Sequence, residues 1–151
     1  MTIEELTIRL KQEAESFNQN EPFASPMLQE QILLKDSFKE MLTVTLACGL
    51  AGEIINREKL ETLINSCFEK FPEILEYAKK DLVATVLRDP ACLGYLEPLL
   101  FFKGFQGLQA YRIAHALWKN NERFIAKMFQ SIISRKFGMD IHPAAQIGHG
   151  L

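Results

Sequence analysis

The sequence predicts an all-α fold over residues 1–138, built from several amphipathic helices. Apolar residues recur three and four positions apart along most of this range, a spacing that places them on one face of a helix. Residues that cap helix N-termini stand in front of these stripes, and proline or glycine follows them. Hydrophobic residues make up 48% of the 151-residue chain, which is enough for the helices to share a buried core.

Three helices are expected in the first half of the chain. The first follows Thr2, which forms a potential capping box with Glu5, and the two prolines within residues 19–27 interrupt the pattern after it. Asp36 is expected to be the N-cap of the second helix and Asn56 that of the third. Their apolar stripes are Ile3, Leu6, Leu10 and Phe17; then Phe38, Met41, Leu42, Thr45, Leu46 and Gly49; then Leu60, Leu63, Ile64, Cys67 and Phe68.

Three more helices are expected in the second half. One starts at Pro72 and ends before Pro90, after which residues 88–99 form a loop or a broken helix. The last runs from Glu122 to Phe137, and Gly138 is its C-terminal stop. The apolar stripes of these three helices are Ile74, Leu75, Ala78, Leu82, Val83, Val86 and Leu87; then Leu108, Tyr111, His115 and Trp118; then Phe124, Ile125, Met128, Phe129, Ile132 and Ile133.

Residues 139–151, MDIHPAAQIGHGL, abandon the helical pattern. Ile141 and Ile147 are six positions apart, and small or turn-forming residues follow each of them. Six-residue units of this kind suit a left-handed parallel β-helix, in which about 18 residues close one turn. Because this stretch is shorter than one turn, we expect it to be extended, and either poorly ordered or paired as a strand with a neighbour. The alternative is a polar tail with two coincidental isoleucines.

The composition argues against several functional classes. A net charge of -2 gives no reason to expect nucleic-acid binding. The N-terminus lacks the apolar core of a signal peptide, and the longest apolar stretch, residues 98–102, is far shorter than the roughly 20 residues that cross a membrane. Cys48, Cys67 and Cys92 are not at metal-ligand spacing, which predicts reduced, buried thiols in a cytoplasmic protein without a metal site.

Two blocks of the chain carry a family resemblance. RDPACLGYLEPLLFFKGFQGLQAYRIAHALW (residues 88–118), followed by MDIHPAAQIGHG (residues 139–150), resembles the serine O-acetyltransferases, which are hexapeptide-repeat acyltransferases. The resemblance implies acetyl transfer from acetyl-CoA to L-serine, the first step of cysteine biosynthesis. It also implies a helical oligomerisation domain over residues 1–138 and the entrance to a left-handed β-helix over residues 139–151. The RDPA and LQAYRI segments argue against other hexapeptide acyltransferases, such as those that act on sugars.

The resemblance assigns roles to two carboxylates. Asp140, immediately before IHP, matches the aspartate that orients the general-base histidine of the family. Asp89, in RDPA, matches a carboxylate that lines the serine pocket and suits the ammonium group of the substrate. In the family, the general-base histidine and the CoA groove follow in a part that these 151 residues do not include. We therefore expect this chain alone to be inactive and to bind no cofactor.

Other conspicuous residues have structural explanations. His115 lies on an apolar helix face and is expected to be a hydrogen-bonded packing residue, while His142 and His149 match no base of the family. The segment KGFQG, residues 103–107, lacks the glycine spacing of a phosphate-binding loop. Basic residues flank the apolar stripe of the helix expected over residues 122–137, and we prefer packing within the domain to a membrane-surface role.

The resemblance also implies partners. Helical domains of the family join two β-helix trimers into a hexamer, and a C-terminal tail docks onto cysteine synthase (O-acetylserine sulfhydrylase). For these 151 residues alone we expect a homodimer formed through the helical surface, without nucleic-acid or membrane partners. A non-catalytic helical oligomerisation module is the alternative to an enzyme. An assay for thiol release from acetyl-CoA in the presence of serine distinguishes the two.

Overall fold

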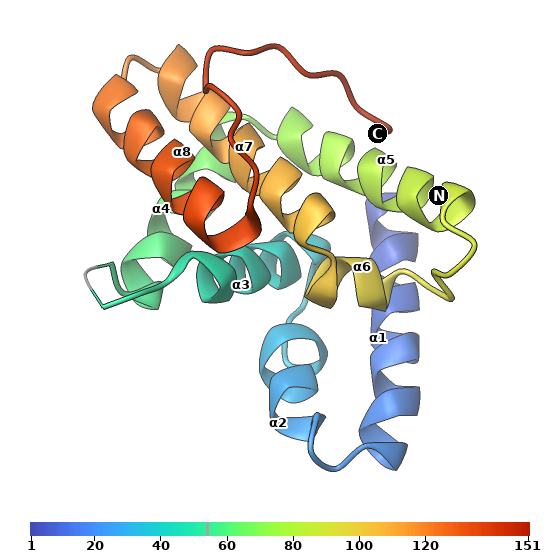
Figure 1. Ribbon diagram of the computed structural model, residues 1–151. Coiled ribbons are helices and arrows are strands. Elements are labelled where there is room, and N and C mark those ends of the chain that lie inside the picture. The colour runs from blue at the N-terminus through green and yellow to red at the C-terminus, as the bar shows by residue number, and fades with distance from the viewer. Residues whose placement is uncertain (54) are drawn as a thin grey trace.

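The computed structural model describes residues 1–53 and 55–151, and within them the fold consists of helices without a strand, so the all-α prediction is confirmed (Figure 1). The elements are α1 (Ile3–Asn20), α2 (Ser25–Leu28), the π-helix η1 (Gln29–Leu33), α3 (Phe38–Leu50), α4 (Arg57–Lys70), α5 (Glu73–Arg88), α6 (Leu96–Phe101), α7 (Lys103–Lys119) and α8 (Arg123–Phe137). None of these helices is both long enough and apolar enough to cross a membrane.

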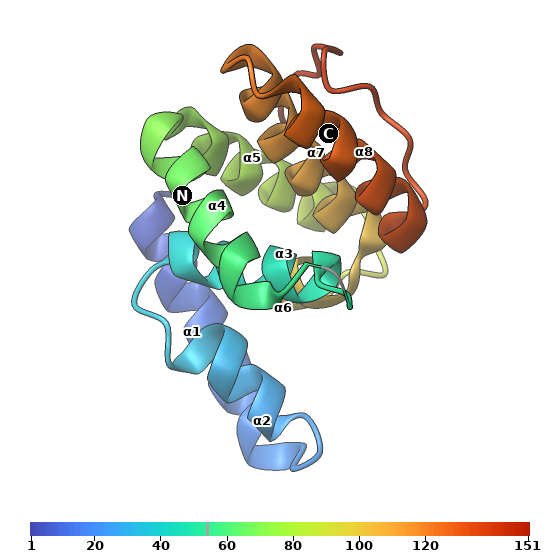
Figure 2. The same cartoon turned by 90° about the vertical axis from the view of Figure 1, so that its left-hand side faces the viewer.

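Helix α7 is the centre of the domain. It contacts α3, α4, α5, α6 and α8, and all of its residues from Phe105 to Leu117 except His115 are buried. A helix that is surrounded in this way needs apolar or paired polar residues on every face, which explains its run of alanine, leucine and glycine. By contrast, α2, η1 and the adjoining end of α1 form an arm that projects away from the other helices in both views, while α1 also contacts α3, α5 and α6 (Figures 1 and 2).

Several helix ends agree with their predicted caps. Thr2 and Glu5 form the capping box, with the Glu5 amide 3.0 Å from Thr2 Oγ1 and the Thr2 amide 2.7 Å from the Glu5 carboxylate. Asn56 accepts a 2.9 Å hydrogen bond from the Lys59 amide at the start of α4. Gly138 ends α8 in the left-handed region, with a φ of 72°.

Other predicted boundaries were wrong by a residue or more. Ser37, rather than Asp36, caps α3, because the Ser37 hydroxyl accepts the Glu40 amide at 3.3 Å. Pro72 is the N-cap of α5 and not its first residue. By contrast, the loop or broken helix expected over residues 88–99 is present, with a loop over residues 89–95 and α6 starting at Leu96. Three residues assigned to apolar stripes are exposed near helix ends, namely Phe17 (46%), Leu87 (79%) and Phe124 (87%).

Candidate functional site

Asp89 lies at the C-cap of α5, where Pro90 prevents the helix from continuing. One carboxylate oxygen, Oδ1, accepts a 2.9 Å hydrogen bond from the Ala91 amide, and the Asp89 carbonyl accepts one from the Cys92 amide at 3.0 Å. These bonds fix the turn and the direction of the side chain. The side chain is half-buried, and Oδ2 receives no hydrogen bond from the residues that the structure describes. Asp89 therefore offers a fixed anionic acceptor at the surface.

Asp140 follows the turn that Gly138 makes at the end of α8. Its side chain is exposed, and Oδ1 accepts a 2.8 Å hydrogen bond from Nε2 of Gln130, which lies two turns earlier on α8. The end of α8 and the end of α5 lie apart in Figure 1, and no hydrogen bond or ion pair of the described residues joins Asp140 to Asp89. The helical domain thus holds the two predicted site residues in separate places.

The three histidines are engaged in packing contacts. Nδ1 of His115 donates to the Pro143 carbonyl at 2.7 Å, in agreement with the expected hydrogen-bonded packing residue. Nδ1 of His142 accepts the Ala144 amide at 3.0 Å, and its ring meets Trp118 edge-on at 4.9 Å between centroids. His149 lies 5.0 Å from the ring of Tyr77. In these positions, none of the three contacts Asp89 or Asp140.

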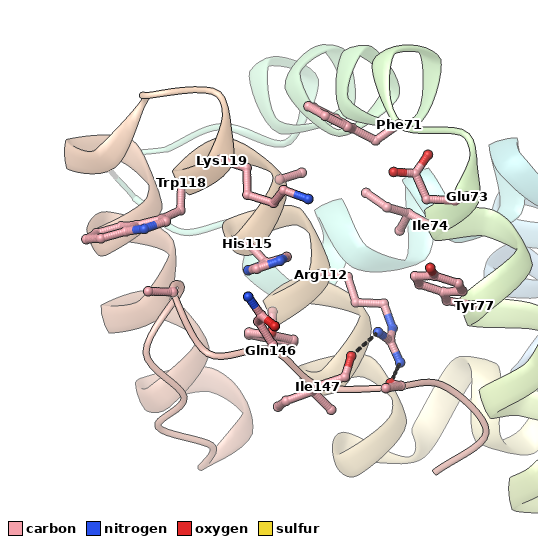
Figure 3. A pocket seen from close by; sticks show the side chains of 14 residues that line it. Phe71, Glu73, Ile74, Tyr77, Arg112, His115, Trp118, Lys119, Gln146 and Ile147 are labelled. Atoms are coloured by element: carbon pink, nitrogen blue, oxygen red, sulfur yellow. Dashed lines mark hydrogen bonds between the residues drawn. The ribbon is translucent and has the colours of Figure 1, made fainter.

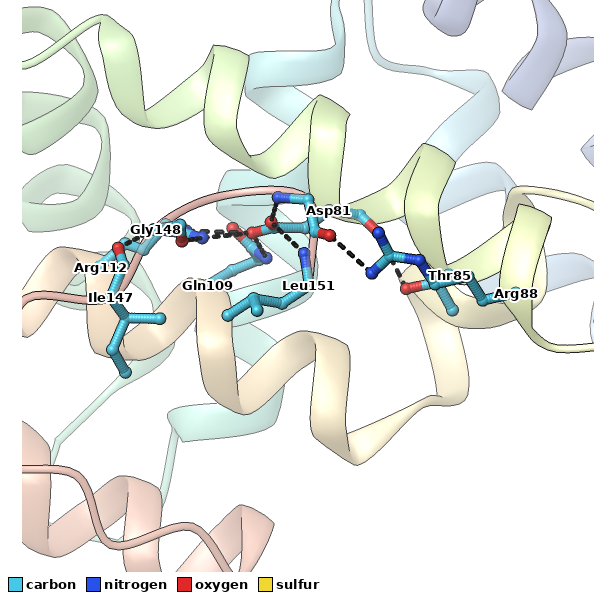
Figure 4. A network of polar contacts seen from close by, with 9 residues as sticks. Asp81, Thr85, Arg88, Gln109, Arg112, Ile147, Gly148 and Leu151 are labelled. Atoms are coloured by element: carbon cyan, nitrogen blue, oxygen red, sulfur yellow. Dashed lines mark hydrogen bonds and ion pairs between the residues drawn. The ribbon is translucent and has the colours of Figure 1, made fainter.

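A buried charge cluster joins α5 to α7 and to the end of the chain (Figure 4). Asp81 on α5 is fully buried, and Arg112 on α7 is 4% exposed. Oδ2 of Asp81 accepts from Arg112 Nη2 at 2.6 Å, from Arg112 Nε at 3.1 Å and from Gln109 Nε2 at 2.9 Å. Oδ1 accepts the backbone amides of Gly150 at 2.6 Å and Leu151 at 3.3 Å. One carboxylate thus joins two helices and the tail.

The tail, residues 139–151, contains no helix or strand and packs on its own helices, whereas it was expected to be poorly ordered or paired as a strand with a neighbour. Its carbonyl oxygens accept from side chains of α5 and α7, which replaces the strand pairing that an extended backbone otherwise requires. The pairs are His115–Pro143, Tyr111–Ala145, Arg112–Ile147 at 3.4 Å, Arg112–Gly148 at 2.7 Å and Arg88–Gly150 at 2.7 Å. Together with Asp81 and Gln109, these donors form what we name the tail clamp.

A groove of about 620 Å³ lies between α5, α7 and the tail (Figure 3). Tyr77, Arg112 and His115 point into it, with Phe71 and Ile74 supplying apolar wall. The Arg112 guanidinium lies 5.3 Å from the centre of the Tyr77 ring, a cation–π distance. Neither Asp89 nor Asp140 lines the groove, so it is separate from both predicted site residues.

Burial controls the ionisation of several groups. It raises the pKa of the Tyr111 phenol, which keeps the hydroxyl protonated as the donor to Ala145. It also raises the pKa of the Cys67 thiol to about 11 and that of Cys48 in the same direction. All three cysteines are free, but Cys48 is only half-buried, so the prediction of buried thiols holds for Cys67 and Cys92. Within the described residues, no group of three or more His, Cys, Asp or Glu side chains could hold a metal ion.

The tail clamp was not anticipated from the sequence. Asp81 stands between Ala78 and Leu82, two residues of the apolar stripe of α5, and Arg112 stands directly after Tyr111 on the stripe of α7. A charged residue inside an apolar stripe was the available signal, because such a residue is buried only with a partner.

Comparison with known proteins identifies the family. Residues 7–110 match the family described as serine acetyltransferase, N-terminal. The serine acetyltransferase of Haemophilus influenzae is 38% identical over 142 residues, which cover 94% of this chain and 53% of that protein. This chain spans about half the length of the curated relatives it matches.

Solved structures agree with the sequence match. A serine acetyltransferase in complex with CoA has a TM-score of 0.96 and 36% identity, over 99% of this chain and 63% of that one. Soybean serine acetyltransferase complexed with serine has a TM-score of 0.95 and 35% identity, over 98% of this chain and 61% of that one. The family match, the sequence identity and the shared fold together show that the chain belongs to the serine acetyltransferase family.

Proposed function

We propose that this chain supplies the helical domain and two site carboxylates of a serine O-acetyltransferase, which converts acetyl-CoA and L-serine to O-acetyl-L-serine and CoA. The observation that carries the proposal is the match along 94% of the chain to a serine acetyltransferase. Relatives solved with serine and with CoA support the choice of substrates.

The reaction needs a base, an orienting group and a site for the ammonium group. The serine Oγ attacks the thioester carbonyl, the new C–O bond forms, the C–S bond breaks, and the hydroxyl proton passes through the base to the departing thiolate. A serine hydroxyl is a weak nucleophile at neutral pH, so a histidine base must remove its proton. We assign to Asp140 the role of accepting the N–H of that histidine and stabilising its imidazolium form.

Asp89 is assigned to the ammonium group of serine. Its turn is fixed through Oδ1, and Oδ2 receives no bond within the described residues, which suits a charge-assisted bond to a small cation. The exposed position of Asp140 similarly suits contact with a histidine that lies outside the helical domain.

We further propose that a polypeptide of these 151 residues has no acetyltransferase activity by itself. Within the described residues, no hydrogen bond joins any of its three histidines to Asp89 or Asp140. The test is to mix the polypeptide with serine and acetyl-CoA and to follow thiol release. We expect the uncatalysed rate, and serine-dependent turnover above it would overturn this part of the proposal.

A chimera tests the catalytic assignment. Residues 1–151 are joined, at the matching position, to the remaining part of the Haemophilus influenzae enzyme. We expect serine-dependent thiol release, and Asp140→Asn should lower kcat on the order of a hundredfold or more because the base loses its orienting carboxylate. A folded chimera that binds CoA but releases no thiol would favour the alternative, a non-catalytic oligomerisation module.

Self-association is the proposed second role of the helical domain. The segment of α1, α2 and η1, part of which projects from the domain (Figure 2), exposes the apolar side chains of Ile8 (58%), Phe23 (101%) and Leu34 (72%). Exposed apolar surface is typical of a protein interface. Light scattering on residues 1–151 should report a dimer that Phe23→Ser weakens. Phe124→Ser, at an equally exposed phenylalanine outside the arm, is the matched control, and a monomer at high concentration would contradict the proposal.

Association with cysteine synthase belongs to a C-terminal tail in the family. We therefore propose that residues 1–151 alone do not bind that enzyme. Co-migration of the two proteins in size-exclusion chromatography would contradict this.

A further inference from the structure

The tail clamp is built from more charge than stability alone requires. Asp81 is fully buried, and Arg112 is 4% exposed. Replacing a buried ion pair by well-packed apolar residues is often neutral or stabilising, because desolvation offsets the attraction between the charges. A geometric role explains the retained charges better than a stabilising one.

The hydrogen bonds to the Asp81 carboxylate show this geometric role. The Asp81 carboxylate receives five hydrogen bonds, three at Oδ2 from Arg112 and Gln109 and two at Oδ1 from the amides of Gly150 and Leu151. A carboxylate offers about four lone-pair sites, so this one is saturated. Arg112 meanwhile donates to the carbonyls of Ile147 and Gly148. The cluster therefore holds residues 147–151 against both helices at once.

The same helix carries the candidate serine-binding residue. Asp89 is eight residues after Asp81 on α5, which is about 12 Å along the axis at 1.5 Å per residue. Both residues belong to one uninterrupted helix with its cap, so a backbone held at Asp81 is held at a set distance from Asp89. The tail itself starts at the other candidate carboxylate, Asp140, and ends at the clamp.

We propose that Asp81 and Arg112 are positioning residues for serine acetylation: they fix the place where residues 147–151 leave the helical domain, and thereby the distance of the family's β-helix from Asp89. The inference rests on the proposed function. Neither residue touches substrate in this assignment. Their effect passes through α5 on one side and through the tail on the other.

The first experiment measures the tail directly in the 151-residue chain by ¹⁵N relaxation. In the unchanged chain, the amides of Gly148, Gly150 and Leu151 should have order parameters near the rigid value of about 0.85. Asp81→Asn should bring them below about 0.6, while amides of α7 stay unchanged. Glu76→Gln, an acidic residue on the same helix outside the clamp, is the matched control and should leave the tail rigid.

Two further variants distinguish loosening of the tail from misfolding of the domain. Tyr111→Phe keeps the buried ring and removes only the hydroxyl that donates to Ala145, so it should loosen the tail without unfolding the core. Arg112→Lys tests the fork geometry, because a compact ammonium group cannot span the separate positions from which Nε, Nη1 and Nη2 of Arg112 reach Asp81 and the two carbonyls. We expect Arg112→Lys not to restore the rigid tail. A tail that stays rigid in all three variants would overturn the proposal.

The second experiment separates positioning from mere stability in the chimera with the Haemophilus influenzae enzyme. Misplacing Asp89 relative to the β-helix should raise KM for serine about tenfold or more in Asp81→Asn, with KM for acetyl-CoA unchanged. A purely structural loss would reduce the amount of active enzyme and leave both KM values as they were, which would overturn the positioning role. If the unchanged chimera is inactive, the proposed function fails with its positioning role, while the relaxation data still decide whether the clamp holds the tail.

Discussion

Two aspartates on α5 have opposite surroundings. Asp81 is fully buried, and its carboxylate receives five hydrogen bonds from α7 and from the tail. Asp89, at the end of the same helix, is half-buried and uses one carboxylate oxygen to hold its own turn. The helix therefore ends in a fixed but accessible carboxylate, and it carries an inaccessible one two turns earlier.

The difference separates structural from functional roles. The Asp81 carboxylate already accepts as many hydrogen bonds as it can, so it cannot also bind a substrate. If it turned away to do so, Arg112 would become an unpaired buried charge. A carboxylate with one oxygen unbonded by its neighbours can accept from a ligand without losing any internal bond. Burial and charge alone would favour Asp81 as the site, whereas the count of unused acceptors favours Asp89.

The largest effect is expected at Asp81. Asp81→Ala leaves the Arg112 guanidinium buried without a counterion and should lower the free energy of unfolding by about 3–5 kcal/mol. Urea denaturation followed by circular dichroism measures this. Glu76→Ala, which removes a partly exposed carboxylate from the same helix, should cost less than about 0.5 kcal/mol. Equal losses of unfolding free energy in the two variants would show that the buried Asp81–Arg112 pair does not account for the effect.

Asp89 should show the reverse pattern. Asp89→Asn keeps an oxygen for the Ala91 amide, so the free energy of unfolding should change by less than about 0.5 kcal/mol. In the chimera, loss of a charge-assisted bond worth about 1.5–3 kcal/mol should raise KM for serine by roughly 10- to 150-fold. Steady-state kinetics with serine varied at saturating acetyl-CoA measures this. An unchanged KM would remove Asp89 from the serine site.

Helix ends were largely predictable because their causes are local. The side chain of Thr2 or Asn56 bonds an amide three residues on, and Gly138 adopts a φ that other residues avoid. Where two adjacent residues compete, as Asp36 and Ser37 do, both are good caps, and the structure shows that the Ser37 hydroxyl accepts the Glu40 amide. Leu87 and Phe124 were wrongly assigned to the buried faces of their helices for another reason. Periodicity shows which face of a helix is apolar, but not where along its length the helix leaves the core.

The tail clamp was beyond prediction for a different reason. Asp81 and Gly150 are 69 positions apart, and no local pattern indicates which residues of α5 and α7 face the tail. The candidate site residues came from the family resemblance, which indicated Asp89 and Asp140 but said nothing about how the tail is held. The tail was expected to be extended, and either poorly ordered or paired as a strand with a neighbour, whereas side chains such as Arg112 bond its backbone.

Backbone geometry at the start of the tail gives a smaller effect. Gly138→Ala places a side chain at a φ of 72° and should cost about 1–2 kcal/mol, although nothing lies within 4 Å of the added Cβ. Gly52→Ala is the matched control, because it also meets nothing within 4 Å and has no positive φ. Thermal unfolding of both variants isolates the conformational cost. Equal melting temperatures would contradict the left-handed turn.

The smallest effect is expected at Arg88, because even a short hydrogen bond contributes little to stability when the donor is exposed to water. Arg88 donates to the Gly150 carbonyl at 2.7 Å, the same distance as the bond from Arg112 to Gly148. Arg88 is exposed, however, so water replaces its bond, whereas Arg112 is 4% exposed and bonded to the buried Asp81. Arg88→Ala should therefore change the free energy of unfolding by less than about 0.5 kcal/mol and leave the Gly148 amide rigid. A loss comparable to that of Asp81→Ala would mean that the tail is held from the α5 surface and not by the buried carboxylate.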